Sequence, residues 1–350
     1  MKRVLLNIST LILYLIFTHT YAHSADTLYI ASWNLQNLFD TIDDPKKNDE
    51  DFIPNGKMIW TEDRLDKKLY NLARVIRSMN HGSGPDLLGV CEVEHQALLD
   101  TMIQKFLPDL NYKTAYIESP DERGIDNGLI FKANEFKVLN VQIDTVHLSS
   151  GWPTRFIFGV NLLMENKDKI TVFVNHWPSR SGGQLRSEPN RIEAAKTLRG
   201  DVDRIFNVDP DAKIFIMGDF NDEPINASIL ETLNAYPLKC DSIRSNYELD
   251  SGGELFNLSY EVFESGLGSY MYQNKWNLLD QIIVSGSLIN GKEINYICHS
   301  FKVYKPNFVI TKSGKFKGAP FPTYGGTRYL GGYSDHFPVI SKFKVNRKIK

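Results

Sequence analysis

The chain has few cysteines, no internal repeat and, beyond its first 22 residues, no long apolar run in its 350 residues. Its 3 cysteines are too few for a fold that depends on a disulfide framework, and one of them must stay unpaired. No later segment is long and apolar enough to cross a bilayer, so we expect no membrane anchor in the mature chain. The sequence also has no His-Glu-x-x-His motif and no cysteine pair with zinc-site spacing, which argues against zinc catalysis.

The first 22 residues resemble a secretory signal peptide. Lys2 and Arg3 precede a mostly apolar stretch at residues 4–17, and the small residues needed for cleavage are available near Ala22. A retained anchor is the alternative, but the stretch is shorter than the roughly 20 residues of a membrane span. We therefore expect export to the periplasm or the extracellular space, where Cys240 and Cys298 could pair. Cys91 lies in an apolar run and should pack as a small hydrophobic residue.

Charge is unevenly distributed along the chain. The formal net charge is −2, yet residues 301–350 hold 11 lysines and arginines against one acid, Asp335. A basic segment of this kind attracts phosphate polymers or anionic surfaces; the alternative is a solvated strand and a frayed tail. Aromatic residues are interleaved with these charges and could either stack on bases or lie in the core. They are Tyr304, Phe308, Phe316, Phe321, Tyr324 and Tyr329.

Hydrophobic patterning predicts strands interleaved with helices. Amphipathic helices are expected at residues 61–79 and 187–206, with Pro189 near the first turn of the second. Because no repeat or linker divides the chain, we expect one mature domain over residues 23–350, a mixed-sheet sandwich with helices outside. The segments expected as strands are residues 27–33, 87–93, 128–131, 138–146, 156–163, 170–175, 213–217, 279–284 and 337–345.

Polar residues that can bind a cation or a phosphate stand at or beside one end of six of these segments. The clearest case is the apolar run at 213–217, which leads into Asp219 and Asn221. Residues two apart on a strand share a face, and α/β sheets place their sites at such ends; ordinary turn chemistry is the alternative. A fold that gathers the six ends would form one cleft. The set is Asn34, Glu92, His176, Asp219, Asn221, Asp280, Asp335 and His336.

In their order, these strand ends resemble the motifs of the endonuclease/exonuclease/phosphatase superfamily, which includes deoxyribonuclease-I-like nucleases, inositol polyphosphate phosphatases and sphingomyelinases. The resemblance spans about residues 27–345. It implies a four-layered α/β sandwich, two central mixed β-sheets flanked by helices, and metal-dependent cleavage of phosphate esters. Cys91 departs from the pattern, since many relatives carry Gln there. The motifs are Ser32-Trp33-Asn34-Leu35, Cys91-Glu92-Val93, Asn175-His176, Gly218-Asp219-Phe220-Asn221, Leu279-Asp280 and Ser334-Asp335-His336.

The resemblance implies a role for each strand-end residue. Glu92 would hold Mg²⁺, or Mn²⁺, with Asn34 and, directly or through water, Asp335. Asp219 is the expected general base, and Asn221 would position the attacking water or the phosphate. His176 and His336 would donate to phosphate oxygens. Asp280 should fix the tautomer of His336 and favour its protonated form, and Asp126 could do the same for His176.

Arginines near the expected cleft suit phosphate binding. Arg180 and Arg186 follow His176 in a glycine-containing loop, Arg123 could join them, and Asn34 could also contact the substrate. Solvated loop arginines are the alternative. Glu94 and His95 are expected at the surface.

Three functions fit the sequence. The first is an exported Mg²⁺-dependent phosphodiesterase acting on nucleic acid. The second is a phosphatase or sphingomyelinase-like phospholipase acting on a small or lipid phosphate ester. The third is a non-catalytic polyanion-binding protein, which a complete set of acids and histidines disfavours. None of the three implies a stable protein partner. The long loops at residues 40–60 and 302–332 would decide the substrate.

Overall fold

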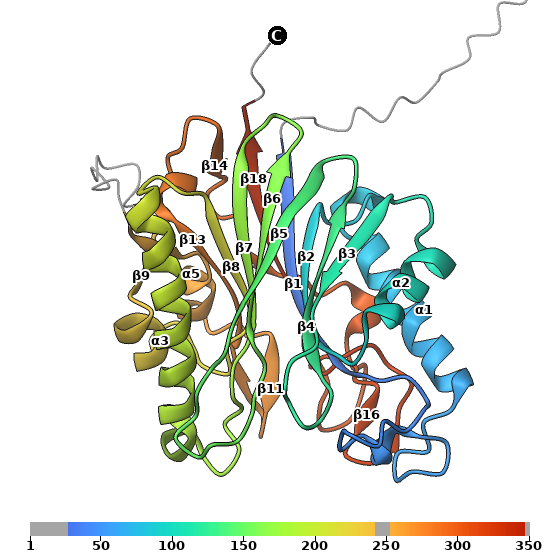
Figure 1. The fold of residues 1–350 in the computed structure, drawn as a ribbon. Helices are drawn as coiled ribbons and strands as arrows, with labels where there is room; N and C mark the ends of the chain where they lie inside the picture. The colour runs from blue at the N-terminus through green and yellow to red at the C-terminus, as the bar shows by residue number, and fades with distance from the viewer. Residues whose placement is uncertain (1–26, 242–252, 347–350) are drawn as a thin grey trace, which may run out of the picture.

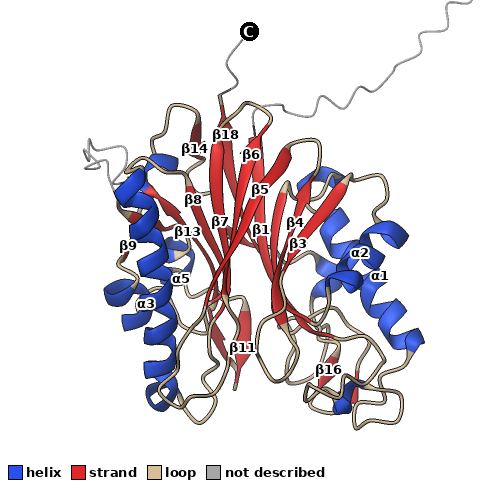
Figure 2. Ribbon diagram, in the orientation of Figure 1, coloured by secondary structure: helices blue, strands red, loops and turns tan. Residues whose placement is uncertain are grey.

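The centre of the fold is a pair of seven-stranded mixed sheets packed face to face (Figures 1 and 2). The computed structural model describes residues 27–241 and 253–346, so the predicted leader lies outside the described residues. The first sheet has the order β14-β18-β1-β2-β4-β3, with β15 paired to β18. Its strands are β1 (Thr27–Leu38), β2 (Leu87–Val93), β3 (Tyr112–Tyr116), β4 (Asp126–Lys132), β14 (Ile294–Tyr296), β15 (Lys302–Val303) and β18 (Val339–Val345).

The second sheet has the order β5-β6-β7-β8-β13-β10-β9. It is mixed, because β7 and β8 are parallel whereas β8 and β13 are antiparallel. Its strands are β5 (Phe136–Asp144), β6 (Ile157–Met164), β7 (Lys169–His176), β8 (Ile214–Asp219), β9 (Ala235–Pro237), β10 (Leu255–Asn257) and β13 (Asp280–Ser285). The smaller hairpins are β11 (Tyr270–Tyr272) with β12 (Lys275–Asn277), and β16 (Tyr324–Gly325) with β17 (Arg328–Tyr329).

Helices form the two outer layers. Figure 2 shows α1 (Glu62–Ser78) and α2 (Gln96–Phe106) over the first sheet and α3 (Gln184–Val208) over the second, with the short α5 (Tyr260–Glu264) on the α3 side. The result is the predicted four-layered α/β sandwich. Among the described residues, no helix is long and apolar enough to cross a membrane.

Alternation along the central strands builds both apolar interfaces of each sheet. In β1, Leu28 and Ile30 belong to the cluster between the sheets, whereas Tyr29 and Ala31 belong to the cluster beneath α1 and α2. Successive side chains of a strand point to opposite faces, so a strand that is covered on both faces must be apolar throughout. This is why the central strands could be found as nearly continuous apolar runs.

All nine predicted strands and both predicted helices are present; β2 has the predicted bounds, and the others have shifted ends. Helix α3 starts at Gln184, so Pro189 lies beyond its first turn, contrary to the prediction. Helix α2 was missed; it is a short helix with four buried apolar residues. Cys240 and Cys298, whose pairing the sequence left open, form a disulfide with a Cα–Cα distance of 5.6 Å. Cys91 is buried and free, as expected.

The aromatic residues of the basic segment serve mainly as core. For six aromatic residues the sequence left two alternatives, stacking on bases or packing in the core. Five of them lie in, or pack against, the hydrophobic cluster beneath α1. Phe316 is 52% exposed. Figure 1 shows that β16, in this segment, lies at the same end of the sheets as β11.

Strand directions bring the predicted site residues to that end. β1 and β2 run parallel, as do β7 and β8, so all four strands finish at matching edges of their sheets. The antiparallel register pairs Asp280, the first residue of β13, with Asp219, the last residue of β8. The segment before β18 lies next to the end of β1, since Ser32 pairs with Val339.

Candidate active site

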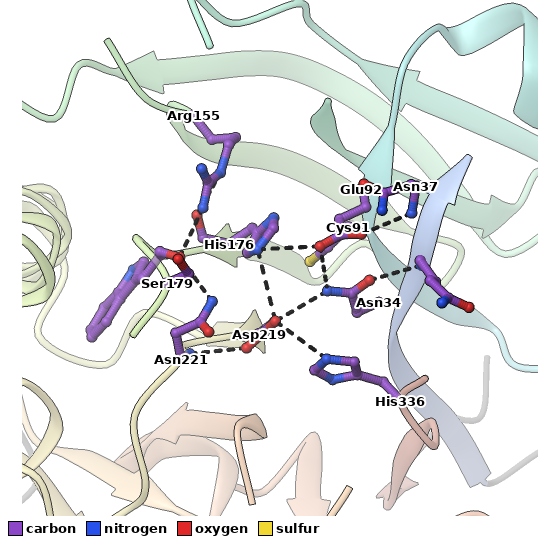
Figure 3. A network of polar contacts seen from close by, with 12 residues as sticks. Asn34, Asn37, Cys91, Glu92, Arg155, His176, Ser179, Asp219, Asn221 and His336 are labelled. Atoms are coloured by element: carbon purple, nitrogen blue, oxygen red, sulfur yellow. Dashed lines mark hydrogen bonds and ion pairs between the residues drawn. The ribbon is translucent and has the colours of Figure 1, made fainter. Parts of the chain in front are cut away.

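The buried carboxylate of Asp219 is the centre of the site, and three other strand ends converge on it (Figure 3). Its Oδ2 accepts a hydrogen bond from Asn34 Nδ2 at 3.1 Å. The same oxygen lies 3.8 Å from His176 Nε2 and 3.9 Å from His336 Nε2. Asn34 is 185 positions away from Asp219 in the sequence, so distant segments are brought to one carboxylate oxygen.

Gly218, the residue before Asp219 in β8, lies too close to β7 to carry a side chain. Gly218 has φ 140° and is paired with Asn175 of β7, and a Cβ at this position would lie 1.9 Å from the Asn175 carbonyl oxygen. Only glycine fits so close an approach. Asn221 has φ 51°, which asparagine tolerates, and its N–H donates to Asp219 Oδ1 at 2.9 Å. We predicted that Asp219 and Asn221 would share one face of a strand. Instead, the chain turns after Asp219, and the backbone N–H of Asn221 binds the Asp219 carboxylate.

Glu92 is aimed at β1 by an irregularity of β2. Its φ is 63°, and the register between β2 and β4 shifts at this point. Glu92 Oε1 accepts from Asn34 Nδ2 at 3.1 Å, and Oε2 accepts from the N–H of Asn37 at 2.8 Å. The Asn34 oxygen accepts from the N–H of Gln36 at 2.9 Å. Asn34 therefore turns its nitrogen to both Glu92 and Asp219 and joins the two carboxylates.

Glu92 and Asp335 fit a hard divalent cation. Burial raises the pKa of Asp335, His336 lowers it, and the neighbouring Glu92 raises it further. Two carboxylates that repel each other in a partly buried place gain stability from a cation between them. Their oxygen atoms are ligands of the kind that hard divalent cations prefer.

His336 is held as a cation. Its Nδ1 lies 2.7 Å from Asp280 Oδ2, an oxygen that also accepts from Ser269 Oγ at 2.6 Å, and the Tyr270 ring stacks on the imidazole at 4.6 Å. Burial lowers the pKa of His336, but the carboxylates of Asp280 and Asp219 outweigh burial, so the pKa lies well above its usual value. The predicted pairing of Asp280 with His336 is confirmed.

The pKa of His176 is shifted in the opposite direction from that of His336. Burial lowers its pKa well below the usual value, and the positive charges of Arg155 and Arg123 lower it further. The predicted pairing with Asp126 is wrong, because the Asp126 carboxylate accepts from Tyr116 and from the N–H of Ser119. His176 is a neutral imidazole whose Nε2 faces Glu92 and Asp219. The two histidines are chemically different.

The three arginines predicted to bind phosphate lie in different environments. Arg180 donates to the Asn221 carbonyl at 2.7 Å and to Asn277 at 3.1 Å, so its guanidinium holds the turn rather than facing a phosphate. Arg186 is exposed on the first turn of α3. Arg123 is half exposed and pairs with Asp121 at 3.2 Å.

Sequence reasoning missed Arg155. This buried residue donates to the carbonyls of His176 and Trp177, at 3.0 and 2.8 Å, and pairs with Asp121 at 2.9 Å. Because Asp121 also pairs with Arg123, a chain of charges runs from the half-exposed Arg123 to the backbone of His176. No local pattern around Arg155 indicates this role, since its partners are carbonyls of a distant strand.

Two buried charged residues beside the site were also missed. Lys68 of α1 donates to the carbonyls of Gln36 and Tyr333, at 3.1 and 2.9 Å, and burial lowers its pKa to about 7. Its position three residues after Leu65 places it on the apolar face of α1, a signal that could have found it. Glu94, expected at the surface, is 2% exposed, so that expectation is wrong.

Comparisons with known proteins agree with this architecture. The profile described as endonuclease/exonuclease/phosphatase family matches residues 29–345. Among curated proteins, none matches the sequence. The human Nocturnin catalytic domain, solved with a bound sulfate anion, is 16% identical with a TM-score of 0.52, over 91% of this chain and 95% of that one.

Two further solved structures share the fold. A mannosyl-6-phosphatase of Bacteroides thetaiotaomicron is 14% identical with a TM-score of 0.55, over 90% of this chain and 99% of that one. D. rerio TDP2, complexed with a single-strand DNA product, is 14% identical with a TM-score of 0.53, over 91% of this chain and 98% of that one. At these identities the likeness concerns the fold.

Proposed function

Because this chain belongs to the endonuclease/exonuclease/phosphatase family, and is thus a hydrolase of phosphate esters, we propose that it is an exported, Mg²⁺-dependent phosphodiesterase that acts on nucleic acid. The observation that carries the proposal is the convergence of Asn34, His176 and His336 on the Asp219 carboxylate. A carboxylate surrounded by donors can accept a proton from water while the donors bind the phosphate.

Glu92 and Asp335 would hold the metal ion, with Mn²⁺ as the alternative to Mg²⁺. When bound, a divalent ion neutralises a phosphate oxygen and the departing alkoxide. Asn34, which we expected to share in binding the metal or the substrate, has its nitrogen toward Glu92 and its oxygen toward Gln36. Its role in the proposal is to hold the Glu92 and Asp219 carboxylates in fixed positions relative to each other.

Asp219 is the proposed general base. Burial raises the pKa of Asp219 to about 6, so the carboxylate is ionised at neutral pH and still basic enough to take a proton. The N–H of Asn221 fixes Oδ1, and Oδ2, which accepts one hydrogen bond from Asn34, keeps a second lone pair for the water. The Asn221 side chain donates to the Trp177 carbonyl at 3.0 Å, so Asn221 acts in this proposal through the backbone.

The histidines would bind the phosphate in different ways. His336, as an imidazolium, presents Nε2–H as a charged donor toward the oxygens around Asp219, which suits an anionic phosphorus centre. His176, as a neutral imidazole, offers one donor without charge. Arg123, half exposed at the outer end of the Asp121 pair, would meet a more distant phosphate.

Nucleic acid is favoured by exposed aromatic residues on loops at this end of the sheets. Trp152 is 63% exposed in the segment between β5 and β6, and Tyr272 is 59% exposed on the hairpin whose Tyr270 covers His336. Exposed rings beside a phosphate site can stack on bases. TDP2, which shares the fold, was solved with a single-strand DNA product.

A small or lipid phosphate ester is the second candidate. It is favoured by the packing of Tyr304, Phe308, Phe321, Tyr324 and Tyr329 against the core, which removes the stacking surface expected in the basic segment. One solved structure with the same fold is named a mannosyl-6-phosphatase, so its substrate is a small phosphate ester.

The test is a substrate panel. The mature protein, residues 23–350, is incubated with plasmid DNA, RNA, sphingomyelin, phosphoinositides and a sugar phosphate, with Mg²⁺, with Mn²⁺ or with chelator. We expect metal-dependent cleavage of nucleic acid. Turnover of a small or lipid ester alone would favour the second candidate, and no turnover of any substrate with metal would contradict the proposal.

Export has its own test. We expect the full chain, produced in a secreting bacterial host, to appear outside the cytoplasm with a new N-terminus near His23, as read by N-terminal sequencing of the purified protein. A protein that keeps Met1 and stays in the cytoplasm would contradict export without touching the catalytic proposal.

A further inference from the structure

A second group of metal-type ligands lies where the loop after β1 meets the turn after β2. Asp40, Glu94 and His95 each offer a ligand atom, and these atoms all lie within 4.8 Å of one another. Glu94 Oε2 accepts from the N–H of Asp40 at 2.6 Å, and Glu94 Oε1 lies 3.8 Å from His95 Nε2. None of the ion pairs formed by the described residues joins Asp40 or Glu94 to a lysine or arginine.

Asp49 adds a buried oxygen without a partner. The residue is 2% exposed and its carboxyl group interacts with that of Glu94. Asp49 Oδ2 accepts from the N–H of Asp44 at 3.1 Å, whereas Oδ1 is buried and accepts no hydrogen bond. Two carboxyl groups buried side by side must share a proton or bind a cation, because two buried like charges are costly.

His95 is oriented as a metal ligand is oriented. Its Nδ1 lies 3.0 Å from Glu118 Oε1. A carboxylate only accepts hydrogen bonds, so Nδ1 carries a proton, and in the neutral imidazole the lone pair is then on Nε2, the atom that faces Glu94. Histidines that bind metal ions usually donate their other ring nitrogen to a carboxylate in this way.

We propose that Asp40, Asp49, Glu94 and His95 bind a divalent transition-metal ion, with Glu118 as the residue that positions His95. Three carboxylates with one imidazole favour an ion that accepts nitrogen as well as oxygen, such as Zn²⁺ or Mn²⁺, over Mg²⁺. The ion would fasten the acidic loop at residues 40–60 to the end of β2, close in sequence to Glu92. This site is structural and is independent of the proposed phosphodiesterase activity.

The test measures Zn²⁺ binding rather than turnover. Chelator-stripped protein carrying Glu92→Gln, which removes the main ligand of the catalytic metal, is dialysed against Zn²⁺ in excess Mg²⁺, and bound zinc is counted by atomic absorption. We expect one Zn²⁺ per chain and a rise in the melting temperature on adding Zn²⁺. Failure to bind zinc, with no rise in melting temperature, would overturn the proposal.

Variants in the same Glu92→Gln background test whether the zinc ion is bound at this cluster. His95→Gln should abolish tight binding and the thermal shift, whereas His81→Gln, at an exposed histidine outside the cluster, should change neither. Glu118→Gln keeps the fold, since this side chain is 59% exposed, and should weaken Zn²⁺ binding by about 10- to 100-fold through loss of the positioning contact. Unchanged zinc affinity in both His95→Gln and Glu118→Gln would overturn the assignment.

Discussion

Replacing Asp280 with asparagine should turn His336 from a cation into a largely neutral imidazole at neutral pH. The Asp280 carboxylate is 2.7 Å from His336 Nδ1, and it is the strongest of the charges that raise the pKa of this histidine. An opposite charge at such a distance shifts a pKa by about 1–3 units. At about 1.4 kcal/mol per unit, the change removes about 1.4–4 kcal/mol of coupling between the two charges.

The Asp280→Asn change is conservative in shape. The asparagine oxygen can still accept from Ser269 Oγ and His336 Nδ1, so the fold should persist while the charge is lost. Because burial alone lowers the pKa of His336, the pKa in the variant should fall toward or below its ordinary value. The alkaline limb of the pH–rate profile should move to lower pH by the same amount.

The stability effect has a defined sign. A histidine whose pKa is raised in the folded state contributes stability that is fully present below the unfolded pKa of about 6.5 and is lost as the pH rises through the folded value. The free energy of unfolding should therefore differ most between wild type and Asp280→Asn in mildly acidic solution, and the difference should shrink at alkaline pH.

The assay is an NMR titration of ¹³C-labelled histidine in metal-free protein, together with the pH–rate profile on a chromogenic phosphodiester. Ser269→Ala is the matched control, because it removes a neutral donor to the same carboxylate and leaves the charge in place. An unchanged His336 pKa in Asp280→Asn would refute the reasoning, since another group would then have to hold the imidazolium.

Two further predictions concern the scaffold of the site, and both are read from the free energy of unfolding in denaturant. Gly218→Ala should be severely destabilised, because its Cβ would lie 1.9 Å from the Asn175 carbonyl oxygen, whereas Gly200→Ala, in an open part of α3, should be neutral or stabilising; equal stabilities would contradict the close approach of β7 and β8. Asp222→Asn should cost about 3–5 kcal/mol, because it breaks a fully buried 2.7 Å pair with Arg191, whereas Glu193→Gln, in an exposed pair, should cost about 1 kcal/mol or less. A small loss in Asp222→Asn would show that the buried pair is not required.

Much of the architecture could be predicted because the central strands are buried on both faces. Nearly continuous apolar runs such as β2 and β8 are visible without knowledge of their partners. The polar residues that end these runs are equally visible, and strand directions then bring them together. The pairing of Asp280 with Asp219 across β13 and β8 follows from this register.

The parts that could not be predicted depend on contacts between distant segments. Glu92 reaches the site through a residue with positive φ, which no composition rule assigns to glutamate. Burial lowers the pKa of both histidines, and the contrast between a cationic His336 and a neutral His176 arises from the Asp280 carboxylate beside one and the Arg155 guanidinium near the other. Arg155 binds backbone carbonyls, and any strand could supply those, so its partners are invisible in sequence.

The most direct test of the catalytic site is the rate of phosphodiester hydrolysis by Asp219→Asn in saturating Mg²⁺. Loss of a general base lowers a rate by about 10²–10⁴-fold, and the variant should keep its melting temperature because asparagine fits the same turn. Asp126→Asn, another buried aspartate but one bonded to Tyr116 and Ser119, is the control and should retain its rate. A folded Asp219→Asn protein with the wild-type rate would contradict the assignment of Asp219 as the centre of the active site.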